Sequence, residues 1–123
     1  MMGNAIVDKS KAFAVRIIRL YQYLNGDKKE FILSKQVLRS GTSIGANVRE
    51  AHRGQSKKDF VAKMNIALKE AAETEYWLEL LHETDYIDST AFESIYKDCN
   101  ELNKLLISII KSANYKLQNT NHK

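Results

Sequence analysis

Basic side chains recur along one stretch of the chain at the spacing of a single helix face. The row consists of Lys35, Arg39, Arg49 and Arg53, and it continues after a turn with Lys57 and Lys58. Such a row can follow a nucleic-acid phosphate backbone without reading the base sequence. Aromatic residues are not interleaved with it, which argues against a platform for stacking single-stranded bases. We therefore expect these residues to contact RNA or DNA, with an ordinary solvated helix face as the alternative.

A second spacing is typical of metal chemistry. Glu79 and His82 form a Glu-x-x-His step, which is half of the di-iron site found in some helical bundles. The other half would need a second such step and two further inward carboxylates, and the sequence has no second step. Both residues also lie beside the apolar seam of their segment. We expect a solvent-facing pair or an interface contact, and we expect no metal and no other cofactor.

Other catalytic groups are not combined in a way that supports a reaction. Cys99 lies on an apolar seam, where a small core residue is expected, whereas a nucleophilic thiol needs an exposed, electropositive setting. The glycines between Gly41 and Gly54 do not follow a strand or match a phosphate-binding loop. We expect no enzymatic activity.

Small and polar residues form another stripe beside the basic row. The stripe contains Ser40, Ser43, Asn47 and Glu50. It predicts either a hydrogen-bonded network that fixes helix packing or subunit register, or a direct ligand contact. Glu50 would need a cationic partner from Arg39, Arg49 or another subunit. Tyr76 and Trp77 lie off the seam of their own segment, so they either widen the core or meet a neighbouring subunit.

The elements that position these groups are helices. Apolar residues at alternating steps of three and four predict helices at about 5–24, 28–53, 57–84 and 90–114, with 115–123 a disordered tail. Capping pairs are expected at Asp27 with Glu30, Ser56 with Asp59, and Thr90 with Glu93, and Asn25-Gly26 is expected to stop the first helix in a left-handed conformation. Short connections between the four helices favour a single all-α domain, an antiparallel up-down-up-down four-helix bundle.

The seams themselves are specific enough to test. We expect the buried positions to be Ile6, Phe13, Ile17, Leu20 and Leu24; Val37, Gly41, Ile44, Val48 and Ala51; Phe60, Met64, Ala67, Ala71, Thr74, Leu78 and Leu81; and Phe92, Ile95, Cys99, Leu102, Leu106, Ile109 and Ala113. Ala14, Ile18 and Tyr21 are expected to widen the first of these faces. Gly41 and Gly45, four residues apart, predict either a close helix approach or a bend.

Composition agrees with a helical protein whose charge is unevenly distributed. The chain has 123 residues, no proline and one cysteine, and it shows no signal peptide or membrane span, so we expect a cytoplasmic protein. Its net charge is +4, yet residues 1–58 hold twelve Lys or Arg against four Asp or Glu, residues 59–101 hold three against eleven, and residues 102–123 hold four against none. This segregation suits an anionic partner such as RNA, or self-association between unlike halves.

The segment from Leu38 to Ala51, LRSGTSIGANVREA, followed by QSKKDF at 55–60, resembles the signature of a bacterial four-helix-bundle family. That family was first noticed as proteins encoded within 23S rRNA intervening sequences, and a related branch contains the accessory protein of diversity-generating retroelements. The resemblance continues through 66–70 to Trp77-Leu78 and covers most of the chain. Many members carry a proline near Gly45, so this chain departs from the pattern there.

The resemblance implies a four-helix bundle that assembles as a homopentamer. Two function classes follow. The first is a non-enzymatic nucleic-acid-binding accessory protein, which acts on structured RNA or assists a reverse transcriptase. The second is a homo-oligomeric scaffold or protein-interaction module with no direct nucleic-acid role.

Overall fold

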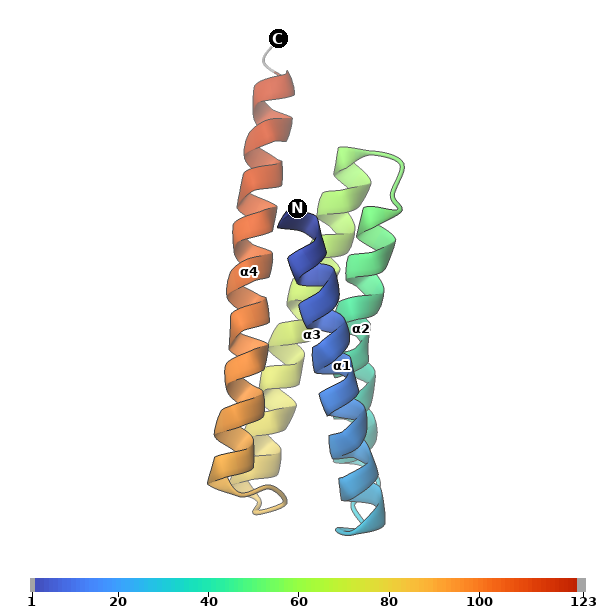
Figure 1. The fold of residues 1–123 in the computed structure, drawn as a ribbon, viewed down its shortest axis with the longest axis vertical. Helices are drawn as coiled ribbons and strands as arrows, with labels where there is room; N and C mark the ends of the chain where they lie inside the picture. The colour runs from blue at the N-terminus through green and yellow to red at the C-terminus, as the bar shows by residue number, and fades with distance from the viewer. Residues whose placement is uncertain (1, 122–123) are drawn as a thin grey trace.

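The computed structural model describes residues 2–121, which fold into four helices. These are α1 (Met2–Gly26), α2 (Leu33–His52), α3 (Lys57–Glu83) and α4 (Ser89–Asn121), and no strand occurs in this range. Figure 1 shows that successive helices run in opposite directions, with the α2–α3 turn at one end and the other two connections at the opposite end. The predicted all-α bundle is confirmed. None of the helices within 2–121 is both long enough and apolar enough to cross a membrane.

One apolar core runs between the helices, and most of its residues belong to the predicted seams. Buried side chains from every helix meet there: Ile6, Phe13, Ile17 and Leu24; Val37, Ile44, Val48 and Ala51; Met64, Ala67, Ala71, Leu78 and Leu81; Ile87 from a loop; and Ile95, Cys99, Leu102, Leu106 and Ile110. Ile87 and Ile110 were not predicted, and five predicted positions are only partly buried: Leu20, Phe60, Phe92, Ile109 and Ala113. Thr74 and Gly41 are also buried, as the spacing predicts. Ile18, which was expected to widen the core, is instead exposed.

Helix α2 begins five residues later than predicted, at Leu33 rather than 28. The carboxylate of Glu30 turns back and accepts hydrogen bonds from the backbone N–H groups of Ile32, Leu33 and Ser34 at 3.1, 3.0 and 2.7 Å. This satisfies N–H groups that the first helical turn leaves without partners. Burial alone would raise the pKa of Glu30, but these bonds outweigh it and the pKa is lowered. Lys29 takes the left-handed conformation in this loop, with φ 54°.

The other helix ends test the remaining capping predictions. Ser56 caps α3 as expected, since its Oγ accepts from the N–H of Asp59 at 3.1 Å. Gly26 is the last residue of α1 and has no positive φ, so the predicted left-handed stop is wrong. At α4 the cap is Asp88, whose Oδ1 accepts from the N–H of Ala91 at 2.8 Å, and the helix begins at Ser89 ahead of the predicted Thr90.

Helix α4 is also longer than predicted. It continues to Asn121, so the expectation of disorder is wrong for residues 115–121, and 122–123 lie outside the described residues. No glycine or proline interrupts this stretch, which is why the helix can continue. In Figure 1 its last turns stand beyond the other helices at the end where α2 joins α3.

The two glycines of α2 mark where α1 comes close. A Cβ at Gly41 would lie 2.7 and 2.8 Å from Cγ1 and Cγ2 of Ile17, whereas a Cβ at Gly45 would meet the carbonyl oxygen of Ser10 at an ordinary 3.4 Å. Helix α2 passes through both positions without interruption. The close-approach prediction is therefore confirmed at Gly41, while Gly45 leaves room for a methyl group.

Candidate nucleic-acid interface

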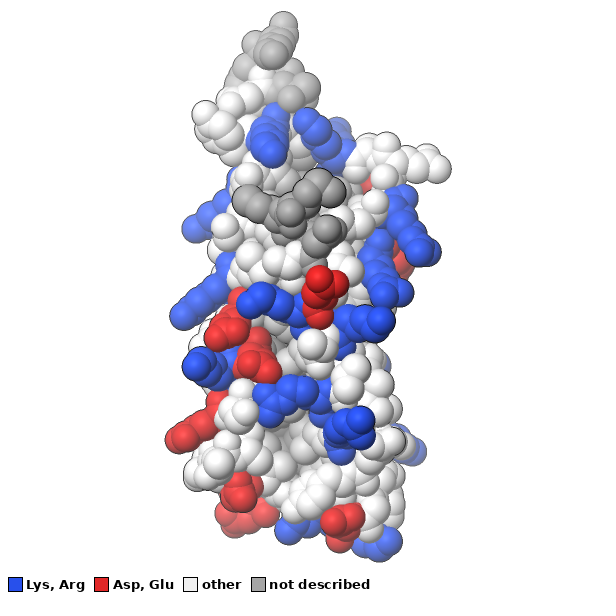
Figure 2. Space-filling view, in the orientation of Figure 1, with Lys and Arg blue, Asp and Glu red and all other residues white. Residues whose placement is uncertain are grey.

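The basic row of α2 remains accessible at three positions. Lys35, Arg49 and Arg53 are exposed, on the side of α2 opposite its buried seam. Within residues 2–121, ion pairs form only between Arg16 and Asp98, Arg39 and Glu70, Arg39 and Glu73, and Lys63 and Glu50. In Figure 2, blue side chains continue along the right edge, over α1 and α2, and on the left and at the foot of the molecule red side chains lie among further blue ones.

Arg39 is directed away from this row. Its guanidinium pairs with the carboxylates of Glu70, at 3.2 Å, and Glu73 on α3. The helical period places Arg39 at the edge of the basic face nearest α3, and a long side chain there reaches the acidic residues of the neighbouring helix. Arg39 thus bridges two helices, and it is less available to an external phosphate than Lys35 or Arg53.

The side chains of Lys57 and Lys58 point in different directions, so the two lysines do not together continue the basic row of α2. Both are exposed in the first turn of α3, and successive helical residues point about 100° apart. Lys57 lines a cavity that it shares with α4, whereas Lys58 is not among the residues that line it. The structure therefore separates the six predicted cations into Lys35, Arg49 and Arg53 on α2, a bridging Arg39, and two divergent lysines at the turn.

A further cation joins Arg49 from α1. A shallow groove of about 270 Å³ runs between the two helices, and its lining consists of Val7, Ser10, Lys11, Ala14, Thr42, Gly45, Ala46 and Arg49. The small residues Gly45 and Ala46 keep it open, and Lys11 and Arg49 both border it. Sequence reasoning missed Lys11, although antiparallel pairing of the first two helices brings the start of one beside the end of the other.

Ser40 of the small polar stripe faces α3 and serves packing within the chain, whereas Ser43 and Asn47 bond within α2. Thr74 Oγ1 donates to Ser40 Oγ at 2.9 Å between two fully buried side chains. Ser43 Oγ donates to the carbonyl of Arg39 at 2.6 Å, and Asn47 Nδ2 donates to the carbonyl of Ser43 at 2.9 Å. The Ser40–Thr74 bond favours the structural alternative at Ser40, whereas the other two bonds do not join α2 to another helix.

Glu50 has a partner that was not expected, and Trp77 and Tyr76 take different positions relative to the core. Glu50 pairs with Lys63 of α3 at 3.3 Å, and neither Arg39 nor Arg49 supplies its cation. Trp77 packs against the core and donates from Nε1 to Glu73 at 3.0 Å, so it widens the core. Tyr76 is 55% exposed, with its ring edge against Trp77 at 5.2 Å between centroids, and it remains on the surface.

Glu79 and His82 contact α4. The hydroxyl of Tyr96 donates to Glu79 at 2.7 Å, and that bond together with burial raises the pKa of Tyr96 to about 12. His82 stacks on Phe92 at 4.3 Å between ring centroids and lies 3.1 Å from the hydroxyl of Ser89. No group of three His, Cys, Asp or Glu residues suited to a metal ion occurs in the described part of the chain.

Cys99 is a core residue. It is fully buried as a free thiol, with Sγ 3.4 Å from the carbonyl of Ala71. Burial raises its pKa, which disfavours the reactive thiolate.

The fold and the accessible cations define a small helical bundle with a basic face on α1 and α2. Residues 3–108 match the model of the family described as 23S rRNA-intervening sequence protein, and the chain belongs to that family. A solved structure of a protein of unknown function from the S23 ribosomal protein family of Bacteroides thetaiotaomicron is 63% identical. It aligns with a TM-score of 0.89 over 90% of this chain and 99% of its own. The chain matches no curated protein.

Proposed function

We propose that this protein is a non-enzymatic, oligomeric accessory protein that binds RNA or DNA phosphates. The observation that carries the proposal is that Lys35 and Arg49 of α2, and Arg53 directly after it, lie exposed without an ion pair to any described residue, and that Lys11 of α1 borders the same groove as Arg49. Cations on a rigid helical scaffold release condensed counterions when they meet a phosphate backbone, which favours binding without base recognition.

The length of the row suits several phosphates. Lys35 and Arg53 are eighteen residues apart, which corresponds to about 27 Å along the helix axis. Duplex DNA rises about 3.4 Å per base pair, so the row covers about eight steps of one strand. Four cations that each neutralise one phosphate would give a slope of log affinity against log salt of about −3 to −4.

Assembly would multiply this modest affinity. The proposed homopentamer repeats the basic face around a ring, and several weak contacts to one nucleic acid then act together. The unequal charge of the two halves of the chain is compatible with contacts between unlike surfaces, which close into a ring when the rotation permits.

The test is fluorescence anisotropy with a structured RNA and a DNA duplex at low and near-physiological salt. A variant with Lys11, Lys35, Arg49 and Arg53 changed to Gln is compared with one in which Arg19, Lys97, Lys104 and Lys111 are changed to Gln. Both variants lose four positive charges from exposed positions, so net charge alone cannot separate them. We expect the first to lose at least tenfold in affinity and most of the salt slope, and the second to lose much less. Equal losses, or no binding by the natural protein at low salt, would exclude the basic face as the binding surface.

A second candidate is a scaffold that binds a protein, for example a reverse transcriptase. The α1–α2 loop favours it, because Phe31 and Ile32 are 52% and 74% exposed, and Tyr23 in the last turn of α1 is 40% exposed. Exposed apolar side chains of this size are typical of protein contacts. Tight binding of one protein that is lost on changing Phe31 and Ile32 to Ser, together with weak RNA affinity, would favour this candidate.

A further inference from the structure

A cavity opens at the end of the bundle where α2 turns into α3. It measures about 300 Å³, and all four helices contribute to it through Ile6, His52, Lys57, Phe60, Ile109, Ser112, Ala113 and Lys116. At the opposite end of the bundle, the α3–α4 loop places the buried side chain of Ile87 on the core. The open end is large enough for a small molecule, since ligand pockets begin at about this volume.

The inner surface of the cavity is apolar. Ile6 is fully buried, and Phe60 and Ile109 are partly buried and pack against the core. The ring of His52 meets the edge of Phe60 at 5.5 Å between centroids, which fixes one wall. Apolar surface of this kind gains free energy when a hydrocarbon group displaces water from it.

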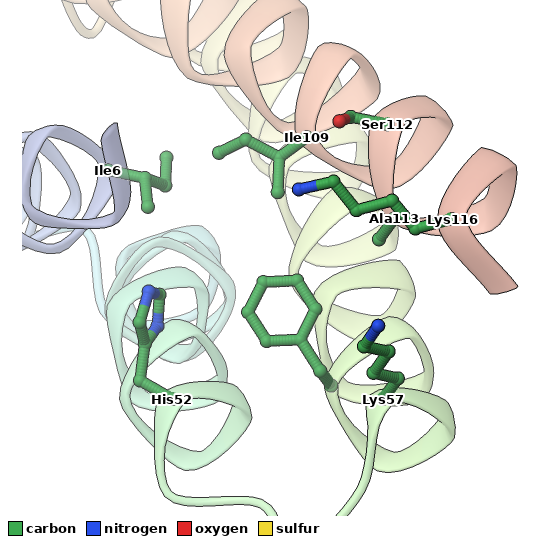
Figure 3. A pocket seen from close by; sticks show the side chains of 8 residues that line it. Ile6, His52, Lys57, Ile109, Ser112, Ala113 and Lys116 are labelled. Carbon is green, nitrogen blue, oxygen red and sulfur yellow. The ribbon is translucent and has the colours of Figure 1, made fainter. Parts of the chain in front are cut away.

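The rim of the cavity is cationic. Figure 3 shows the side chains of Lys57 and Lys116 approaching the mouth from two different helices, with His52 across from them. None of the eight described residues that line the cavity is acidic. Lys57 also belongs to the first turn of α3, where the helix dipole adds positive potential.

We propose that this cavity binds a small organic anion with an apolar body, of the class of a medium-chain carboxylate. The hydrocarbon part covers the exposed portions of Phe60 and Ile109 above the buried Ile6, and the carboxylate lies between Lys57 and Lys116. An inorganic anion would leave the apolar wall exposed to water, and a neutral hydrocarbon would make no use of the lysines. A nucleobase fits less well, because its edge needs several neutral hydrogen-bonding partners. Among the lining residues the hydroxyl of Ser112 is one such group, and His52 Nδ1 already lies 2.9 Å from the carbonyl of Val48.

The test uses sodium octanoate as the probe, with octan-1-ol and sodium acetate as matched probes that lack the charge or the chain. Titration of the full-length protein is followed by amide chemical shifts in NMR spectra. We expect saturable shifts at Phe60, Ile109 and Ala113 with octanoate, and an affinity at least tenfold lower for each of the other two probes. Equal affinity for octan-1-ol and octanoate, or shifts centred elsewhere, would overturn the proposal.

Three variants localise the site. Ala113→Trp fills the cavity and is expected to abolish octanoate binding, with Ala113→Leu as the smaller change if the Trp variant melts early. Lys116→Gln is expected to weaken octanoate by about fivefold and leave octan-1-ol unchanged. Lys111→Gln, an exposed lysine of α4 outside the lining, is the control. Octanoate binding that survives both Ala113 variants in the folded protein would contradict the assignment, and so would equal losses in the two lysine variants.

Discussion

The hydroxyls of Ser40 and Thr74 meet in the otherwise apolar layer between α2 and α3, and both side chains are fully buried. Thr74 Oγ1 also lies 2.8 Å from the carbonyl of Glu70, and its single hydrogen donates to one of these two acceptors at a time, so neither hydroxyl lacks a partner. Removing one hydroxyl of such a buried pair destabilises the fold more than replacing both by apolar groups, because the remaining hydroxyl loses its hydrogen-bond partner. The pair therefore helps to fix which faces of the two helices meet.

Ser40→Ala and Thr74→Val are each expected to lower the free energy of unfolding by about 1 kcal/mol. The double variant is expected to lose less than the sum, because no unpaired hydroxyl remains. Urea denaturation of the four proteins measures this coupling. Light scattering should give the same mass for all four, since the pair lies inside one chain. Additive losses, or a change of mass, would assign the stripe to another role.

Gly41 and Gly45 are expected to respond oppositely to alanine. Gly41→Ala forces a methyl group against Cγ1 and Cγ2 of the buried Ile17, atoms that cannot move without the whole side chain, and should destabilise by about 1–3 kcal/mol. Gly45→Ala meets the Ser10 carbonyl at contact distance and should stabilise by up to about 1 kcal/mol through helix propensity. Thermal melting followed by circular dichroism compares them. Two shifts of melting temperature in the same direction would contradict this account.

At the scale of elements, Glu30 decides where α2 begins. Its lowered pKa means that the folded state favours the carboxylate, so its stabilisation is present above the ordinary value of 4.5 and is lost as the pH falls through the lowered pKa. Glu30→Gln is expected to cost about 1–2 kcal/mol at pH 7, because a charged acceptor of three N–H groups becomes a neutral one. The difference from the natural protein should shrink well below pH 4, as measured by urea denaturation across pH. A difference that does not change between pH 7 and pH 3 would mean that the charge of Glu30 is not what stabilises the cap.

The helices could be predicted from the spacing of their buried apolar residues, but the residues at which they begin and end could not. The spacing of Phe13, Ile17 and Leu24 follows from burial at a 3.6-residue period, and the structure buries all three. Helix ends depend instead on single hydrogen bonds. Asp27 with Glu30 suggests a capping box that starts a helix at once, but Glu30 bonds forward to Leu33 and Ser34. Asp88 likewise acts where Thr90 was expected, because short polar side chains compete for the same N–H groups.

The exposed positions of the candidate nucleic-acid interface could also be predicted from the sequence, but its contacts between helices could not. Helical period alone placed Lys35, Arg49 and Arg53 on an exposed face of α2, and the structure leaves them there. Period could not show that Arg39 pairs with Glu70, or that Lys11 borders the groove beside Arg49, because both depend on which helices are neighbours. The sequence of one helix does not show which other helices pack beside it, so contacts between helices could not be predicted from it.

At the scale of the whole molecule, few charged side chains form ion pairs between helices. Arg16 pairs with Asp98 at 2.6 Å between α1 and α4, and the other ion pairs within 2–121 join α2 to α3. The remaining cations of α1 and α2 are exposed, and α4 adds exposed lysines at Lys97, Lys104 and Lys111. Exposed pairs contribute little to folding, so these exposed cations matter for partners more than for stability.

The proposed ring needs a surface other than the basic face, which would otherwise be unavailable to nucleic acid. Of the residues that the sequence suggested for the subunit contact, Ser40 is buried within the chain, Ser43 and Asn47 are half-buried, and Glu50 and Tyr76 are exposed. We expect light scattering at micromolar protein to give about five times the subunit mass of 14.1 kDa. Tyr76→Ala should reduce that mass, whereas Tyr115→Ala, at another exposed tyrosine, should leave it unchanged.

The salt dependence of the two measurements then distinguishes subunit assembly from nucleic-acid binding. A contact centred on an aromatic ring is only weakly screened, so the mass should persist at 0.5 M salt, while phosphate binding falls steeply over the same range. If Tyr76→Ala breaks the ring, RNA affinity should also fall although no cation has changed, because the repeated basic faces no longer act on one molecule. A monomer at every concentration, or an RNA affinity that is the same for ring and monomer, would remove valency from the proposed function and leave the α1–α2 face to act alone.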